Sequence, residues 1–389
     1  MMRIKKKFGI YDIETVLFVL TVVFNSVFGS TTEMLFLSKI PMLTFFLVEL
    51  VIISLEKRFT VDRLMIFPLL FFVLEAVSLF WSYNYSVSYA QFITQIQLFC
   101  LFVFVFLYIK RIDNINIYLI SIYVSGLALM VYSLTVYGVG QYFSLLMSGA
   151  RLGGEIANEN TYGMAFSQAA VVAFYYFLEN KKIFHIPAIF ALTVFAFSSG
   201  SKKAAIMIPL GLLFIVFIKY GIKKAWMGLL ILTLSFIILY NMIQLPVFST
   251  VLKRLTLFAT GESYSDNVRK EFITIGLDLY HKNPFGLGLQ SFAYVTRINS
   301  YSHNNMVELL VSLGFIGLVL FYVPFARYIW WSFFRIKYKD PVSNVLLVLV
   351  LISMIMGYGM VQFYGKGIWI LMGVMMAHYQ NEKEKARAE

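Results

Sequence analysis

The chain has 389 residues, of which 60% are hydrophobic and only 13% charged, and its mean hydropathy is +0.78. A soluble domain carries roughly 25% charged residues, so the composition excludes an ordinary soluble protein and indicates an integral membrane protein. The net charge of +12 does not require a nucleic-acid partner, because basic loops flank membrane spans. The single cysteine, Cys100, excludes a disulfide framework.

About twelve hydrophobic runs of helical length follow one another along the chain. Because they are continuously apolar rather than alternating, they predict an all-α polytopic membrane protein and argue against a β-barrel. We expect residues 1–389 to form one membrane domain. The runs lie near 13–29, 34–54, 64–81, 88–109, 115–137, 161–178, 183–199, 204–219, 225–244, 305–334, 343–362 and 367–380.

The basic residues predict the orientation of these spans. Most of the 32 lysines and arginines lie in segments at one end of the spans, and each of these segments carries two or more. The positive-inside rule places them in the cytoplasm, together with both chain termini. The segments are 3–7, 57–63, 110–111, 181–182, 219–224, 335–339 and the tail from 383.

Residues 245–303 form the one long outside loop, and loops of this length are usually functional. Within it, "SDNVRKEFITIGLDLYHKNP" has apolar residues at helical spacing, with Ser265 and Asp266 as cap candidates and a stop at Asn283-Pro284. This pattern predicts an amphipathic helix lying on the outer leaflet. The following "FGLGLQSF" predicts a turn punctuated by glycines.

Polar and basic residues gather at the outer ends of the spans. In "RLGGEIANENTYG", residues 151–163, Arg151 precedes a helix start that contains Asn160, which indicates an anion site or an ordinary capped loop. In "SSGSKKA", Ser201 is a candidate cap for a helix whose first turn holds Lys202 and Lys203. Positive charge there opposes the helix dipole, which indicates either a bound anion or snorkelling to lipid head groups.

Two further stretches complete this set of candidates. Arg269 lies in the loop helix, where it is either a phosphate ligand or an ordinary surface arginine. The stretch "NSYSHNNMVELLVSLGFIG", residues 299–317, places His303 and Asn304 at the start of an apolar helix, with Glu308 about one turn further on. A histidine there can exchange a proton or donate to phosphate, or it simply borders the helix.

The roles of several other polar and aromatic residues remain open. Trp81 and Tyr83 can stack on sugars or form the usual interfacial belt. Glu75 lies inside a span, where ionisable residues are commonly functional, and Lys366 near the outer start of the last span has no assigned role. Lys39 and Arg327 fall within spans. Because the sequence has no metal-ligand cluster and no nucleotide-binding glycine loop, we expect neither a metal nor a cofactor. The outside cations indicate a phosphate-bearing ligand.

Four motifs in this order resemble the Wzy/WaaL superfamily of bacterial O-antigen polymerases and ligases. They are "RLGGEIANEN", "SGSKKA", the arginine-bearing loop helix with "NPFGLGLQSF", and "HNNMVELLVSLGFIGL"; "VSLFWSYNYSVS" is similar to the family too. The resemblance covers most of the chain and is most specific over residues 150–317. It implies a GT-C-like membrane glycosyltransferase that uses undecaprenyl-pyrophosphate-linked oligosaccharides at the outer face of the cytoplasmic membrane, without metal or nucleotide.

The resemblance also implies roles for individual residues. Arg269 matches the family's loop arginine and His303 its histidine, while Lys202 stands where the family often has arginine and offers a point charge instead of a bidentate contact. Lys202, Lys203, Arg151 and Arg269 are then expected to neutralise the pyrophosphate leaving group. His303 is expected either to take the proton of the acceptor hydroxyl or to bind the pyrophosphate. Candidates for contact with sugar or acceptor are Asn160, Asn304, Glu308, Trp81 and Tyr83.

A repeat-unit polymerase for O-antigen, capsule or exopolysaccharide is the first expectation for the function. The alternative is an O-antigen ligase, which transfers finished glycan to lipid A core or protein. A transporter or flippase for lipid-linked sugars fits less well, because it predicts internal repeats that the sequence does not show. Expected partners are the lipid bilayer, a flippase and a chain-length regulator, and no nucleic acid.

Overall fold

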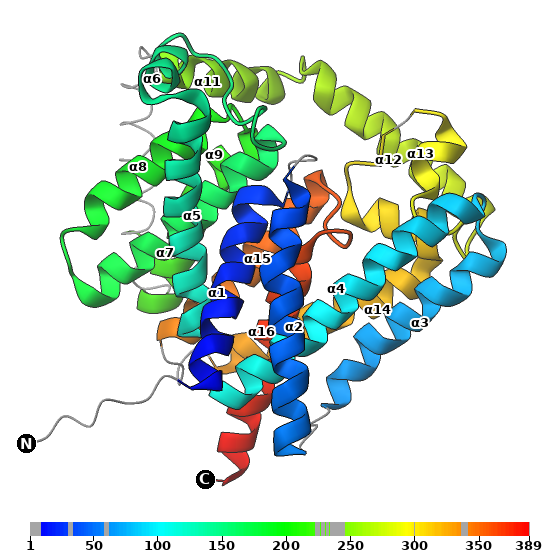
Figure 1. Cartoon of the computed structure of the whole chain (residues 1–389). Helices are drawn as coiled ribbons and strands as arrows, with labels where there is room; N and C mark the ends of the chain where they lie inside the picture. Colours follow the sequence, from blue (N-terminus) through cyan, green and yellow to red (C-terminus); the bar gives the residue numbers. More distant parts are fainter. Residues whose placement is uncertain are drawn as a thin grey trace, which may run out of the picture.

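The computed structural model describes residues 9–29, 34–57, 62–221, 246–298, 300–335 and 341–388, with the isolated positions 226, 230 and 233. Within these residues the chain is α-helical and contains no strand. Most long helices run between the two ends of one bundle (Figure 1). The predicted all-α class is therefore confirmed.

The helices coincide with the predicted hydrophobic runs, except for the run 225–244, which lies almost wholly outside the described residues. They are α1 (Ile10–Phe28), α2 (Leu35–Glu56), α3 (Ile66–Ser78, between the 3₁₀ turns Arg63–Met65 and Leu79–Trp81), α4 (Tyr85–Ile112), α5 (Asn116–Tyr137), α7 (Glu159–Asn180), α8 (His185–Ser198), α9 (Lys202–Tyr220), α14 (Asn305–Arg335), α15 (Pro341–Met356) and α16 (Lys366–Ala388). Eight of the described helical segments are long and apolar enough to cross a membrane: α1 to α5, α9, α14 and α15, with α3 counted together with its flanking turns. The protein is thus a multi-pass membrane protein.

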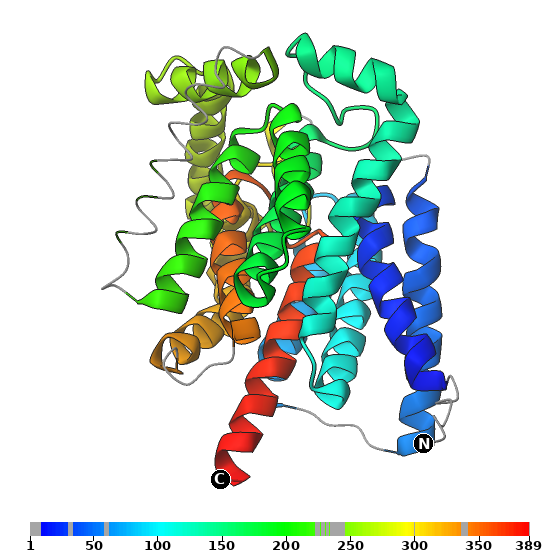
Figure 2. The same cartoon turned by 90° about the vertical axis from the view of Figure 1, so that its left-hand side faces the viewer.

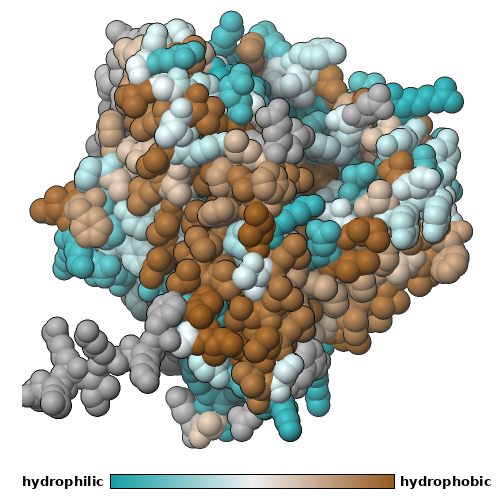
Figure 3. Space-filling model, viewed as in Figure 1, coloured by the Kyte–Doolittle hydropathy of each residue, from teal (hydrophilic) through white to brown (hydrophobic). Residues whose placement is uncertain are grey.

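The bundle has a wide apolar surface and two more polar ends. Helix α1 begins and α16 ends at the same end of the bundle, as Figure 2 shows, which agrees with the expectation that both termini share one side. In Figure 3, hydrophobic side chains cover much of α1, α2 and α3, while hydrophilic side chains lie at both ends of the bundle. An apolar band of this kind matches the hydrocarbon core of a bilayer.

The long loop folds into three helices at the end opposite the termini, beside the short helix α6 (Val139–Met147). These are α11 (Pro246–Ala259), α12 (Tyr264–Lys282) and α13 (Ser291–Thr296). Helix α12 confirms the predicted amphipathic helix, and it ends before Asn283 as expected. The predicted caps were wrong, because Ser263 occupies the N-cap position and Asp266 lies in the first turn. Helix α12 buries Phe272 and Gly276 against α13 and α14.

A break in α14 attaches this loop to the bundle. Gly314 has φ +67° inside the helix, and a Cβ atom there would lie 2.2 Å from the carbonyl oxygen of Pro284. The predicted glycine-punctuated turn makes this close approach. In it, Leu287 N donates to Val311 O at 2.8 Å and Gly288 N donates to Ser312 O at 3.0 Å. Backbone therefore packs directly on backbone, which only glycine permits. This contact fixes the end of α12 against the helix that His303 precedes.

Candidate active site

The N-terminus of α9 is built as the sequence predicts. Ser201 caps the helix by accepting a hydrogen bond from Ala204 N, so Lys202 and Lys203 lie in the first turn. The Ser201 hydroxyl also donates to Asn160 Oδ1 at 2.9 Å. This bond links the starts of α7 and α9 and places Asn160 at the base of the basic turn.

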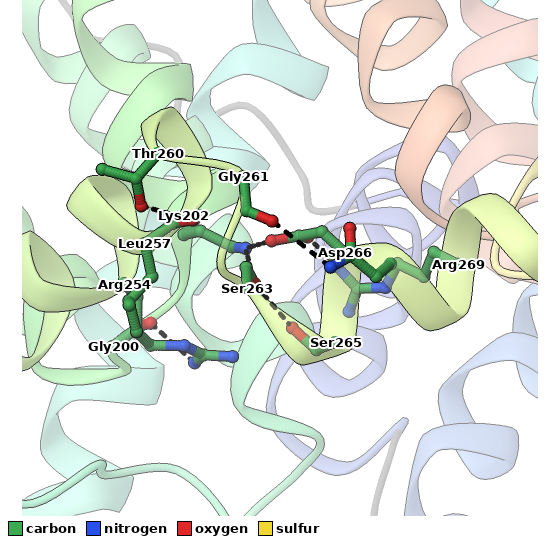
Figure 4. Close-up of polar contacts among 11 residues, drawn as sticks. Gly200, Lys202, Arg254, Leu257, Thr260, Gly261, Ser263, Ser265, Asp266 and Arg269 are labelled. Carbon is green, nitrogen blue, oxygen red and sulfur yellow. Dashed lines mark hydrogen bonds and ion pairs between the residues drawn. The ribbon is translucent and has the colours of Figure 1, made fainter.

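Lys202 and Arg269 meet on one carboxylate, that of Asp266 (Figure 4). The Lys202 ammonium forms an ion pair with Asp266 Oδ2 and lies 3.4 Å from Ser263 Oγ, while Arg269 Nη1 lies 3.4 Å from Asp266 Oδ1. Burial alone would raise the pKa of Asp266, but hydrogen bonds from Lys202 and Ser263 and the two positive charges outweigh it and lower that pKa. Asp266 is therefore ionised and positions both cations.

Asp266 was missed as a site residue, since the sequence suggested only a helix cap. A usable signal was present, because Asp266 precedes Arg269 by three residues and side chains at that spacing share one face of a helix. Its pairing with Lys202 was not visible in the sequence, since the two residues come from separate helices.

A second pair of cations, Arg151 and Arg254, lies at the turn before α9. Arg151 Nε donates to Ser199 O at 3.1 Å and Arg254 Nη1, from α11, donates to Gly200 O at 2.9 Å. Burial, with the charge of Arg254 added, lowers the pKa of Arg151, while Glu159 partly offsets this effect. Within the described part of the chain, Arg151 Nη2 is buried and has no hydrogen-bond partner. Arg254 was also missed, although the sequence pair "KR" in the long loop offered a signal.

Lys203 points away from Lys202. Its ammonium donates to the carbonyl oxygen of Gly359, in the segment 357–365 that joins α15 to α16 and that we name the outer connector. Asn304 Nδ2 donates to the carbonyl of the neighbouring Tyr358 at 3.1 Å. The two adjacent lysines thus serve different contacts, one toward the long loop and one toward the outer connector.

His303 lies immediately before α14 in a left-handed conformation, with φ +57°. Its ring stacks on Phe272 with centroids 6.1 Å apart, lies beside Tyr301, and Nε2 is 3.3 Å from Ser300 Oγ. Burial, then the positive charges of Arg269 and Lys203, lower the pKa of His303 to about 4. The ring is therefore neutral at pH 7, and the structure brings it together with Arg269 and Lys203.

Asn304 and Glu308 hold the His303 turn in place. Asn304 Oδ1 accepts from Met306 N at 2.9 Å and from Val307 N at 3.1 Å, so Asn304 and not His303 caps α14. Glu308 is buried, and its Oε2 accepts from Ser302 N at 2.8 Å. These bonds give both side chains structural roles, and sugar contact by either remains a prediction.

The aromatic candidates lie apart from the basic residues. Trp81 and Tyr83 follow α3 and are exposed, and the Tyr83 amide donates to Leu287 O at 2.7 Å. Among the described residues, no hydrogen bond or ring contact joins these two side chains to Lys202, Arg269 or His303. Tyr83 thus borders the loop that follows α12. Glu75 is fully buried in α3, and neither of its carboxylate oxygens has a hydrogen-bond partner within the described residues.

A comparison with known proteins matches part of the chain, including much of this site, to a protein family. Residues 187–322 match a family model described as O-Antigen ligase, Wzy_C. The matched segment runs from α8 into α14 and includes Lys202, Asp266, Arg269 and His303, whereas Arg151 precedes it. No curated protein matches the chain. This match supports the resemblance of this multi-pass membrane protein to the Wzy/WaaL superfamily of O-antigen polymerases and ligases.

Proposed function

We propose that this protein is a repeat-unit polymerase of the bacterial cytoplasmic membrane, with both termini in the cytoplasm. It joins undecaprenyl-pyrophosphate-linked oligosaccharides into O-antigen, capsule or exopolysaccharide at the outer face, with a flippase and a chain-length regulator as partners. The observation that carries this proposal is the convergence of Lys202, Arg269 and His303, from three separate segments, within the domain that matches O-antigen ligases.

The cations act on the leaving group. When the bond between the anomeric carbon and the pyrophosphate oxygen breaks, negative charge grows on that oxygen, and Lys202, Lys203 and Arg269 neutralise it. A preorganised contact of this kind typically contributes a factor of roughly 10²–10³ to the rate. Arg151 extends the same charged surface with its buried Nη2 atom. Because side chains supply this positive charge, the reaction that we propose needs no metal.

His303 acts on the acceptor. The acceptor hydroxyl attacks the anomeric carbon opposite the pyrophosphate, so the carbon–oxygen bond to the acceptor forms with inversion as undecaprenyl pyrophosphate leaves. The hydroxyl proton passes to the imidazole, and general-base catalysis of this kind contributes a factor of roughly 10²–10⁴. Bound pyrophosphate compensates the charges of Arg269 and Lys203, which raises the pKa of His303 from about 4 toward its ordinary value. Substrate binding thus makes the ring a better base.

Glycan analysis of a deletion strain tests the assignment. Complementation with the wild-type gene should restore long glycan ladders, whereas His303→Ala, Arg269→Ala and Lys202→Ala should give single capped repeat units at equal membrane abundance. Wild-type ladders from both His303→Ala and Arg269→Ala would reject this site. If the deletion strain instead accumulates long polymer on undecaprenyl carrier, the protein is a ligase that transfers glycan to lipid A core or protein.

A further inference from the structure

A separate cavity of about 490 Å³ lies between α1, α2, α4, α5, α7, α15, α16 and the outer connector. Its volume falls in the range of ligand pockets, roughly 300–1,000 Å³. Its polar lining includes Asn25, Lys39, Thr94, Gln97, Gln168 and Lys366. None of the residues discussed above as anion ligands lines it, so its occupant is not explained by the site around Arg269.

Two lysines give this cavity its charge. Lys39 comes from α2 and Lys366 is the first residue of α16, and their ammonium groups are close enough to repel one another. Among the residues that the structure describes, no aspartate or glutamate lines the cavity and neither lysine forms a salt bridge. Lys366 Nζ donates only to the hydroxyl of Ser38, at 2.9 Å. Two uncompensated like charges in a partly buried cavity are unfavourable unless an anion joins them.

The position of Lys366 repeats the arrangement at Lys202. Both are the first residues of their helices, where a positive charge opposes the helix dipole, and the first turn of α16 contains no acidic residue. At α9, Asp266 compensates Lys202. No described carboxylate does this for Lys366, so the charge of Lys366 has no partner of opposite sign within the described residues.

The outer connector forms a wall between the two sites. On the side of the candidate active site, Lys203 donates to Gly359 O, and Asn305 Oδ1 accepts from Gln362 N at 2.7 Å and Phe363 N at 3.0 Å. On the other side, Gln362 and Gly365 line the cavity. A single stretch of chain therefore contacts both the candidate active site and the cavity.

We propose that the cavity with Lys39 and Lys366 binds the phosphate-bearing head group of the acceptor, a second polyprenyl-linked oligosaccharide. This inference rests on the proposed polymerase function, in which both substrates carry a pyrophosphate. Two like-charged head groups need two sets of cations, and Lys202, Lys203 and Arg269 serve the donor. A bilayer phospholipid has the same head-group chemistry, so the experiment must separate these two sources.

Native mass spectrometry of the full-length protein, with undecaprenyl pyrophosphate as the probe, tests the proposal. Wild-type protein should bind two molecules. Lys39→Gln with Lys366→Gln should lose one of them, with affinity at that site weakened about 10- to 100-fold, and Lys202→Gln with Arg269→Gln should lose the other. Lys366→Arg should retain binding. Lys253→Gln with Lys282→Gln, at exposed lysines of α11 and α12, is the matched control.

The possible results separate the two proposals. Two bound molecules in Lys39→Gln with Lys366→Gln would overturn the second site, even if the donor site stands. One bound molecule in wild type, lost only in that variant, would support the second site and count against the donor site. A titration with phosphatidylglycerol completes the test: if it displaces the second molecule as readily as undecaprenyl pyrophosphate does, the cavity is a phospholipid site and the acceptor assignment fails. Unfolding midpoints of all variants establish that they are folded.

Discussion

Lys202, the first residue of α9, forms an ion pair with Asp266, which lies 64 residues further along the chain in the first turn of α12. The pair docks the long loop on the bundle and gives Arg269 a shared partner. It also means that the resting site carries an internal anion, which an incoming pyrophosphate must displace or join. Asp266 is thus a positioning residue in the proposed site.

Asp266→Asn should tighten donor binding and lower turnover. The change removes a negative charge that competes with pyrophosphate, but it also releases Lys202 and Arg269 from a common position. We expect a lower donor KM with kcat reduced by about tenfold, a modest share of the factor that one preorganised contact supplies. Steady-state kinetics on purified protein measures both values. Glu262→Gln, at an exposed residue nearby, is the control, and an unchanged kcat in Asp266→Asn would refute the positioning role.

Arg269→Ala should reduce kcat by roughly 10²–10³, since it removes one fixed positive charge from the leaving group. Arg269→Lys should restore part of the rate, because a lysine supplies the charge without the planar guanidinium. Single-turnover transfer from a lipid-linked oligosaccharide measures the effect. Lys270→Ala alters the neighbouring exposed residue and should leave the rate unchanged; equal losses at both positions would indicate a general disturbance of α12.

The pH dependence should report the pKa of His303 in two states. A base must be unprotonated, and the pKa of free His303 is about 4, so kcat/KM should fall on acidification only near that value. The acid limb of kcat should lie at higher pH, because bound pyrophosphate compensates Arg269 and Lys203. An acid limb of kcat/KM near 6.5 in wild type would contradict the geometry.

Arg269→Gln offers a second check on the same residue. Removing this positive charge should raise the pKa of free His303, so the acid limb of kcat/KM should move to higher pH. His303→Ala should abolish that limb along with a factor of roughly 10²–10⁴ in rate. His281→Ala, at the exposed histidine of α12, should retain the wild-type profile.

Gly314→Ala should detach the long loop from α14 and lower both stability and activity. A Cβ atom at Gly314 would lie 2.2 Å from Pro284 O, and φ of +67° is unfavourable for any L side chain. We expect a loss of more than about 1 kcal/mol, in line with a non-glycine residue in a strained conformation. Thermal unfolding in detergent measures it. Gly140→Ala, where added atoms meet open space, is the control, and equal midpoints for both variants would show that the contact is dispensable.

Much of the bundle was predictable, because the membrane imposes one rule on every span. Continuous apolar runs must be helical to satisfy their backbone hydrogen bonds in lipid, so the runs predicted α1 to α5, α9, α14 and α15. The first turn of α9 followed from local capping by Ser201. Local chemistry also predicted α12, although the cap was misplaced by two residues because Ser263, and not Ser265, precedes the first helical residue.

The contacts between distant segments could not be predicted in the same way. Which carboxylate pairs with Lys202, which carbonyl receives Lys203, and which charges lower the pKa of His303 depend on how helices pack, and packing is not encoded at a fixed spacing. The sequence by itself determined an all-helical membrane protein with cations at one end. Only the tertiary structure decided that Asp266 positions two of them and that Lys39 and Lys366 face a cavity of their own, since ion pairs and cavities arise from the approach of separate helices.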